Sequence, residues 1–239
     1  MKRYIFTVFL TLALSLQLPG PSAASSDAEL KDVIAAVEKS YESLADLQAS
    51  FSQKAYIPSV KREQTGNGKL FIRMRPGGSA LFRFDYAKPK QLIVSNGSTV
   101  WFYLPENRQV MVTDVKSLFE EGNGLALSFL TGIGRISRDF KVSKADGGRD
   151  GAGNHLLELV PKAPSRTVAK LRLTVSAEAV NRFLKEGSLK GIFPIVSSMV
   201  FDPFGTRTVI EFSDVKVNGG ISRSLFTFKP PAGVEVIRQ

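Results

Sequence analysis

The run Leu81-Phe82-Arg83-Phe84-Asp85-Tyr86 decides the fold, because its aromatic rings occupy every second position. Successive side chains of a β-strand point to opposite faces of a sheet, so this spacing predicts a strand with one aromatic face. Phe71 opens the same stretch, and Trp101-Phe102-Tyr103 continues it. So many large apolar rings on one small sheet either fill a core or line an apolar cavity.

The dipeptide Asn96-Gly97 gives the sharpest local signal in this stretch. It separates the apolar run Leu92–Ser95 from the run Ser98–Tyr103. An Asn-Gly pair between two apolar runs favours a type I′ turn, because both central residues of that turn need a positive φ. We therefore predict two antiparallel strands joined at this turn.

Period-two alternation extends along most of the chain and predicts about ten short strands. They are spread evenly from Leu47 to Phe228, with turns such as Asp202-Pro203-Phe204-Gly205 between them. No strand–helix–strand rhythm is present, which argues for one antiparallel sheet. A sheet of that width tends to curl or to close on itself.

Two helical segments are predicted beside these strands. Apolar residues at helical spacing predict a helix from Asp27, as its N-cap, to Leu44. Short helices interrupted by glycines are predicted between Val115 and Leu130. Ser176–Ile192 fits a turn followed by either a helical or an irregular insertion. We expect the helical segments to cover an open face of the curled sheet.

The N-terminus is typical of a cleavable secretory signal peptide at residues 1–24. Lys2 and Arg3 precede the apolar run Tyr4–Leu18, and Ser22-Ala23-Ala24 supplies small residues for cleavage. The alternative is an uncleaved anchor, although the apolar run is short for a membrane span. Residues 25–239 then form a single domain outside the cytoplasm. The chain has no cysteine, which excludes disulfides and lipidation at the cleavage site.

The formal net charge is +10. A basic surface suits nucleic acid, anionic lipid headgroups or an acidic partner. The basic residues are scattered along the predicted strands and form no Lys/Arg-rich block, which argues against nucleic acid as a partner.

Catalytic chemistry has little support in the sequence. His155 is the single histidine, and it begins an apolar strand, where a structural role is expected. No nucleophile elbow, phosphate-binding glycine loop or zinc-protease motif is present. Asp146 and Asp150 lie in a glycine-rich turn with too few oxygen ligands for calcium. Asp85 lies among aromatics, but no second carboxylate pairs with it for sugar hydrolysis. We therefore expect no enzyme, no metal site and no cofactor.

Arg75 leaves two interpretations open. It ends the aromatic strand before Pro76, and an inward-pointing guanidinium there needs acceptors for its five donors. Helix-end carbonyls would supply them and make Arg75 a latch that holds a helical lid shut. Alternatively, it is an exposed arginine at the end of a strand.

Several motifs in fixed order resemble one family. They are Leu47-Gln48-Ala49-Ser50-Phe51-Ser52-Gln53, Gly68-Lys69-Leu70-Phe71-Ile72, Arg75-Pro76, the aromatic run Leu81–Tyr86, Pro89, Ile93-Val94-Ser95-Asn96-Gly97, Val100-Trp101-Phe102-Tyr103 and Phe226-Thr227-Phe228-Lys229-Pro230-Pro231-Ala232-Gly233-Val234. Together they resemble the LolA family, the periplasmic outer-membrane lipoprotein carriers of Gram-negative bacteria. The resemblance covers roughly Leu30 to Val236, and the order of the motifs carries it rather than any single motif.

The resemblance implies a mainly β fold, in which a curled antiparallel sheet forms an unclosed β-barrel with an α-helical lid over an apolar cavity. It implies a monomer in the periplasm that binds acylated lipoproteins. Such a carrier accepts them from an inner-membrane ABC transporter of the LolCDE type and passes them to an outer-membrane acceptor. The lid-holding arginine of the family corresponds to Arg75, and its sheet aromatics correspond to Phe82 and Phe84.

The predicted lipid-binding residues are Phe71, Phe82, Phe84, Tyr86, Trp101 and Phe102, with Arg75 as the lid latch. Two features depart from the family pattern: Gly77-Gly78-Ser79 lengthens the turn after Arg75, and Ser176–Ile192 differs from the usual short hairpin. Other functions also remain open. They are a glycolipid carrier or an envelope-stress sensor of the same fold, and a hydrolase acting on lipid or glycan.

Overall fold

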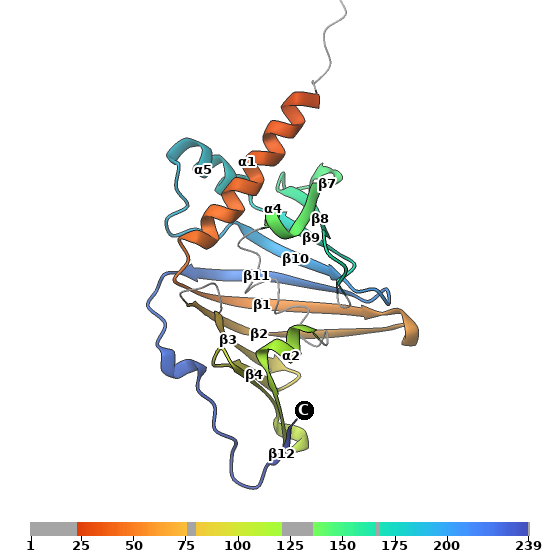
Figure 1. Ribbon diagram of the computed structural model, residues 1–239, viewed down its shortest axis with the longest axis vertical. Helices are drawn as coiled ribbons and strands as arrows, with labels where there is room; N and C mark the ends of the chain where they lie inside the picture. Colours follow the sequence, from red (N-terminus) through yellow and green to blue (C-terminus); the bar gives the residue numbers. More distant parts are fainter. Residues whose placement is uncertain (1–22, 76–79, 121–135, 166–167, 239) are drawn as a thin grey trace, which may run out of the picture.

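The computed structural model describes residues 23–75, 80–120, 136–165 and 168–238 (Figure 1). The strands in these residues are β1 (Asp46–Ile57), β2 (Arg62–Met74), β3 (Ala80–Lys88), β4 (Gln91–Ser95), β5 (Thr99–Leu104), β6 (Gln109–Asp114), β7 (Phe140–Arg149), β8 (His155–Pro161), β9 (Lys170–Val175), β10 (Ile195–Phe201), β11 (Arg207–Val217) and β12 (Glu235–Arg238). The α-helices are α1 (Ala23–Glu42), α2 (Val115–Glu120), α4 (Ile136–Asp139) and α5 (Ala177–Glu186), and short 3-10 turns are η1 (Pro58–Val60), η2 (Pro105–Asn107) and η4 (Arg223–Phe226).

The twelve described strands form one sheet in the order β12-β6-β5-β4-β3-β2-β1-β11-β10-β9-β8-β7. Neighbouring strands are antiparallel except at one edge, where β12 runs parallel to β6 with Val236 opposite Val110. Among the described residues the two edge strands β12 and β7 do not pair, so the sheet is unclosed. The mainly β fold and the curled, unclosed sheet predicted from the sequence are confirmed.

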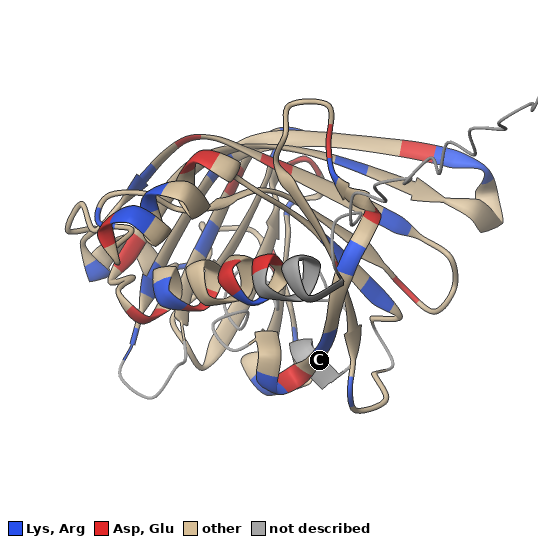
Figure 2. Ribbon diagram, turned by 90° about the horizontal axis from the view of Figure 1, so that it is seen from above, with Lys and Arg blue, Asp and Glu red and all other residues tan. Residues whose placement is uncertain are grey.

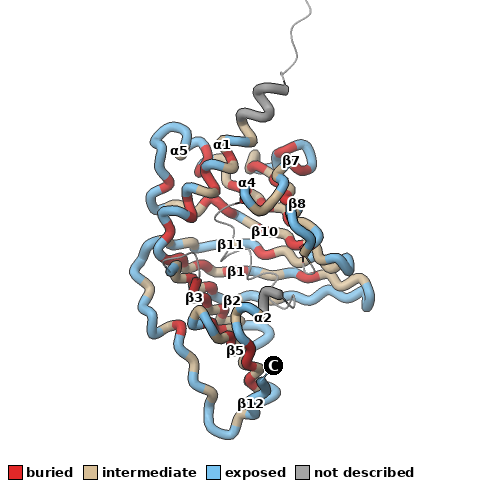
Figure 3. The backbone as a smooth tube through the Cα atoms, in the orientation of Figure 1, coloured by how far each residue is buried: buried red, intermediate tan, exposed pale blue. Residues whose placement is uncertain are grey.

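One face of the sheet is covered by helices. The strands curve around α1, which lies against α5 and α4 (Figure 2). Buried residues gather where α1 crosses the sheet and along the strands beneath it (Figure 3). The side chains on this helix-covered face alternate with those on the opposite face, called here the outer face, along every strand.

The core lies between α1 and the helix-covered face. Val33, Ala36 and Val37 on α1 are at most 1% exposed, because an apolar stripe at helical spacing faces the sheet. The sheet contributes aliphatic side chains from both halves of the strand order to this core. They include Leu47, Leu70, Ile72, Leu157, Leu159, Leu171, Leu173, Val200 and Ile210.

A C-terminal segment, residues 218–234, runs along the outer face from the end of β11 to the start of β12 (Figure 1). The buried carboxylate of Asp46 anchors its start: it accepts hydrogen bonds from the backbone N–H groups of Gly219 at 2.8 Å and Gly220 at 3.0 Å. Arg73 donates to the carbonyl of Ile221, and Arg83 donates to the carbonyl of Leu225. These contacts hold η4 against β3.

Two local predictions differ from the structure in informative ways. The helix begins at Ala23, so the predicted N-cap at Asp27 is wrong. The hairpin turn at Asn96-Gly97 is not type I′, because only Gly97 has a positive φ, +92°. The Asn96 side chain instead accepts hydrogen bonds from the backbone of Ser98 and Thr99 and closes the turn itself.

Ser176–Ile192, for which the sequence left a helical or an irregular insertion open, contains the helix α5 at Ala177–Glu186. Ser176 caps α5 by accepting a hydrogen bond from the N–H of Ala179 at 3.2 Å, and Gly187 ends the helix in the left-handed conformation. The predicted helical segment after Val115 is confirmed as α2 up to Glu120, and its continuation to Leu130 lies outside the described residues. Residues 1–22 of the predicted leader also lie outside them.

Candidate functional site

Four of the predicted lipid-binding aromatics lie together on the helix-covered face. Phe82 lies opposite Ile72, and Phe84 lies opposite Leu70 and Ile93. Phe102 is the next residue across the ladder from Ile93. Directly opposed residues share a face of the sheet, and Tyr86 follows Phe84 by two positions. Phe82, Phe84, Tyr86 and Phe102 therefore form one aromatic row across β3, β4 and β5.

The other two predicted residues, Phe71 and Trp101, lie on the outer face. Phe71 is opposite Arg83, and Trp101 is opposite Val94. The Trp101 ring lies 6.2 Å from the ring of Phe228 in the C-terminal segment. The alternation itself carries this information, because Trp101 and Phe102 are consecutive residues of one strand and must point to opposite faces.

The aromatic row is packed rather than open. Phe82 and Phe84 are each 1% exposed. The ring centroids of Phe51 and Phe84 lie 5.5 Å apart, and those of Phe51 and Tyr86 lie 4.8 Å apart, both edge to face. The Tyr86 hydroxyl donates to Oε1 of Gln53 at 2.8 Å, and burial raises the pKa of Tyr86 to about 12. Phe51 was not among the predicted site residues, although its place in the alternating run Leu47-Ala49-Phe51 puts it on this face.

Helix α1 buries Tyr41, whose hydroxyl group is left without a hydrogen-bond partner among the described residues. Tyr41 is 5% exposed, and its ring lies edge to face with Phe193 at 5.5 Å between centroids. Burial also raises the pKa of Tyr41, since the phenolate is poorly solvated there. A buried hydroxyl without a partner costs about 1–3 kcal/mol, so this contact is weaker than an all-apolar one.

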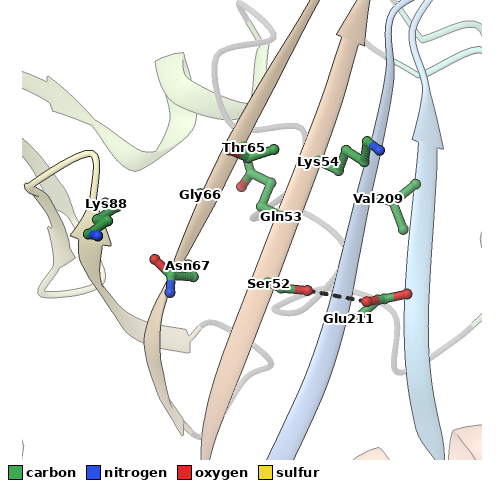
Figure 4. Close-up of a pocket in the computed structure, with 9 residues that line it drawn as sticks. All are labelled: Ser52, Gln53, Lys54, Thr65, Gly66, Asn67, Lys88, Val209 and Glu211. Carbon is green, nitrogen blue, oxygen red and sulfur yellow. Dashed lines mark hydrogen bonds between the residues drawn. The ribbon is translucent and has the colours of Figure 1, made fainter.

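Two hollows lined by described residues lie beside β1, β2 and β11. One is lined by Ser52, Gln53, Lys54, Thr65, Gly66, Asn67, Lys88, Val209 and Glu211 and holds about 600 Å³ (Figure 4). The second adjoins it, shares Ser52, Asn67 and Glu211, and holds about 830 Å³. Ser52 lies opposite both Asn67 and Glu211 in the ladder and donates to Glu211 at 3.2 Å. These hollows are lined largely by polar side chains. Gln53, the hydrogen-bond partner of Tyr86, lines the first, and Phe51, which packs against Tyr86, lines the second.

Arg75 is exposed at the end of β2. A Cβ atom added to Gly97 would lie 2.4 Å from an Nη atom of Arg75 and 3.2 Å from Leu81. The guanidinium therefore lies over the turn between β4 and β5, where the positive φ of Gly97 favours glycine. The latch role of Arg75 stays a prediction, since residues 76–79 and 121–135 lie outside the described part of the chain.

His155 has a structural environment. It is 4% exposed at the start of β8, and its Nδ1 lies 3.6 Å from a carboxylate oxygen of Glu29 on α1. Lys144 and Arg149 also contact Glu29, so this cluster ties α1 to the β7–β8 hairpin. Burial lowers the pKa of His155, and hydrogen bonds from Lys144 and Arg149 lower the pKa of Glu29.

Neither a metal-ligand cluster nor a membrane-spanning helix occurs in the described residues. No group of three or more His, Cys, Asp and Glu side chains in them is placed to hold a metal ion. None of the helices in residues 23–75, 80–120, 136–165 and 168–238 has the length and apolar character needed to cross a bilayer. Asp150 instead closes its own turn by accepting from the backbone of Ala152 and Asn154.

The fold and the site define a class of proteins in which one curled sheet keeps an apolar, aromatic face beneath helices. The family model described as outer membrane lipoprotein carrier protein LolA matches residues 42–229. An outer-membrane lipoprotein carrier protein of Pseudomonas paraeruginosa is 32% identical over 196 residues, which cover 81% of each chain. One from Nitrosomonas europaea is 30% identical over 239 residues, which cover 100% of each. The chain belongs to the LolA family of outer membrane lipoprotein carrier proteins.

Solved structures are similar at lower sequence identity. An uncharacterized conserved protein from Thermus thermophilus aligns with a TM-score of 0.49 at 14% identity, covering 88% of this chain and 99% of that one. A LolA superfamily protein from Nitrosomonas europaea aligns with a TM-score of 0.41 at 12% identity, covering 84% of this chain and 97% of that one.

Proposed function

We propose that this chain is a periplasmic carrier, without catalytic activity, that holds the acyl chains of lipoproteins against the aromatic row and moves them towards the outer membrane. Membership of the LolA family is the observation that carries this proposal. The row of Phe82, Phe84, Tyr86 and Phe102 on the helix-covered face supports it, because acyl chains need a continuous apolar face.

Cargo must displace part of the helical cover to reach the whole row, since Phe82 and Phe84 are already buried. Burying each large apolar side chain of α1 contributes about 1.5–3 kcal/mol, so Val33, Val37 and Tyr41 together contribute about 5–9 kcal/mol. Each buried methylene of cargo contributes about 0.8 kcal/mol, so a chain of roughly fifteen methylenes contributes about 12 kcal/mol. Cargo therefore outcompetes the helix, while the competition keeps net affinity low enough for release.

The partners follow from this role. We propose that an inner-membrane ABC transporter of the LolCDE type delivers acylated lipoproteins to the monomeric carrier, and that an outer-membrane acceptor removes them. Transfer needs no ATP at the carrier if each later site binds the acyl chains more favourably. If Arg75 is a lid latch, Arg75→Leu leaves cargo binding intact and disturbs release, and unchanged transfer to an acceptor would exclude the latch.

The test uses two consecutive, half-buried aromatics on opposite faces. Binding of a fluorescent fatty acid is measured for Phe102→Ser and for the matched control Trp101→Ser. We expect Phe102→Ser to weaken binding about tenfold, because it removes a ring from the helix-covered face, and Trp101→Ser to change it little. Equal effects of the two substitutions would exclude the aromatic row as the binding face.

Native mass spectrometry of the protein purified from the periplasm identifies the cargo. Co-purifying lipoprotein supports the proposal, whereas bare glycolipid would favour a glycolipid carrier of the same fold. An empty protein that also fails to take up fatty acid would exclude a carrier and leave a sensor role.

A further inference from the structure

Two hairpin turns lie side by side at one end of the sheet, far from the aromatic row. The first is the turn of residues 57–62 between β1 and β2, and the second is the turn of residues 202–206 between β10 and β11. β1 pairs with β11, with Tyr56 opposite Arg207, so both turns leave the sheet at the same end (right in Figure 1). A Cβ atom added to Gly205 would lie 3.5 Å from Pro58, so the turns touch. We call these two turns the double tip.

Each turn of the double tip presents one large apolar side chain to solvent. Phe204 is 84% exposed and Val60 is 63% exposed, the two largest exposures among the described large hydrophobic residues that are exposed. A single exposed apolar residue is ordinary on a protein surface, but two on touching turns make this end of the sheet an apolar point.

Hydrogen bonds hold the backbone of both turns of the double tip in place, so the conformation of its turn exposes the Phe204 ring. Asp202 accepts hydrogen bonds at 2.8 Å from the N–H groups of both Phe204 and Thr206. The N–H of Asp202 donates to the carbonyl of Thr206 at 3.0 Å. On the other turn, the N–H of Lys61 donates to the carbonyl of Pro58 at 3.1 Å. The ring of Phe204 therefore projects from a closed turn.

Positive charge surrounds this apolar point. Lys61 and Arg62 are exposed and make no salt bridge with any other described residue. The guanidinium of Arg207 lies over the Tyr56 ring, 5.3 Å from its centroid. The nearby carboxylate of Glu63 is paired with Lys54 at 3.0 Å, and that of Asp202 is engaged by its own turn.

We propose that the double tip docks the protein on the anionic surface of a phospholipid bilayer. Phe204 and Val60 enter the headgroup layer, where aromatic side chains are favoured, and Lys61, Arg62 and Arg207 lie against lipid phosphates. A protruding apolar point with a basic rim suits a soft, negatively charged surface better than it suits a protein, which would need a matching groove and carboxylates. The inference goes beyond the proposed carrier function, because it requires no cargo.

The experiment is vesicle flotation with the full mature protein. Vesicles of phosphatidylethanolamine with phosphatidylglycerol are compared with vesicles of phosphatidylcholine alone. We expect the protein to float with the anionic vesicles and much less with the neutral ones. We expect Phe204→Ser combined with Val60→Ser to lower partitioning about tenfold or more, because it removes the inserted side chains. Lys61→Gln and Arg62→Gln should each lower it roughly fivefold on anionic vesicles only.

The matched control is Leu184→Ser, which removes a 54% exposed apolar side chain on α5, away from the double tip. We expect it to float like the wild-type protein. Failure of the wild-type protein to float, or equal flotation of the double-tip and Leu184 variants, overturns the proposal. A loss of flotation that accompanies a changed oligomeric state in size-exclusion chromatography also overturns it. Fatty-acid binding by the same variants reports on the carrier function separately and is expected to stay unchanged.

Discussion

Tyr41→Phe should stabilise the protein, because it removes a buried hydroxyl that has no partner among the described residues and keeps the ring. An unsatisfied buried hydroxyl costs about 1–3 kcal/mol. The edge-to-face contact with Phe193 at 5.5 Å does not involve the hydroxyl and is retained. We expect the free energy of unfolding to rise by about 1 kcal/mol, and Tm to rise by about 2–4 °C for a chain of this size.

The same substitution tests whether α1 leaves the sheet when cargo binds. If the helix must move, stabilising its closed position by about 1 kcal/mol weakens the binding of a fluorescent fatty acid about fivefold. Thermal and urea unfolding measure the first effect, and a fluorescence titration measures the second. A stability gain with unchanged affinity would refute displacement of α1, and unchanged or lower stability would refute the argument from the unpaired hydroxyl.

Tyr86→Phe is the matched control, because the Tyr86 hydroxyl donates to Gln53 at 2.8 Å. Its removal leaves the amide oxygen of the half-buried Gln53 without this donor. We expect stability to fall by about 1 kcal/mol, opposite in sign to Tyr41→Phe. The two substitutions make the same chemical change in one core, so a difference in sign can be assigned to the hydrogen bond alone.

Three further outcomes follow from the described contacts. Asp46→Ala removes the carboxylate that accepts hydrogen bonds from Gly219 and Gly220. The free energy of unfolding measured in urea should fall by about 2–3 kcal/mol. A fall of less than about 0.5 kcal/mol would show that the C-terminal segment is anchored elsewhere. Gly68→Ala places a Cβ atom 2.0 Å from the backbone oxygen of Asp85 and should cost about 2 kcal/mol or more in stability, whereas Gly66→Ala meets the movable ring of Tyr86 at 3.0 Å and should cost less. Similar losses for the two glycines would contradict the close approach of β2 and β3. Stability should also fall on acidification, because the pKa values of His155 and Glu29 are lowered in the folded protein. The unfolded chain then binds more protons, below about pH 6.5 at His155 and below about pH 4.5 at Glu29. In Glu29→Gln, Tm measured against pH should fall less steeply below about pH 4.5.

The sequence predicts the sheet well because alternation is a local property. Each strand from Leu81–Tyr86 outward shows its period-two pattern within a few residues, and the curl follows from the number of strands. The parallel pairing of β12 with β6 could not be predicted in this way. It depends on where the C-terminal segment ends after crossing the outer face, which is set by distant contacts such as that of Arg73 with Ile221.

The placement of the site required register as well as composition. Phe71 and Trp101 look equivalent to Phe82 and Phe102 when aromatics are counted, and only the parity of the ladder separates them. For Trp101 and Phe102 the sequence alone shows that they lie on opposite faces, because they are consecutive residues of one strand. For Phe71 the face depends on which β3 residue lies opposite, and the turn between β2 and β3 does not reveal that in the sequence.

The division into two faces explains why one stretch of chain carries so many aromatic residues. On the outer face, Trp101 packs beside Phe228 and helps to fix the C-terminal segment permanently. The other face, which carries Phe102, is the face on which α1 packs, and the α1 contact includes the Tyr41 hydroxyl that has no partner among the described residues. A permanently packed face and a face with a displaceable cover need equal apolar surface, so composition alone does not distinguish them. The difference lies in what covers each face: a segment anchored by the charged groups of Asp46, Arg73 and Arg83, or a helix that packs mainly through side chains an acyl chain can replace.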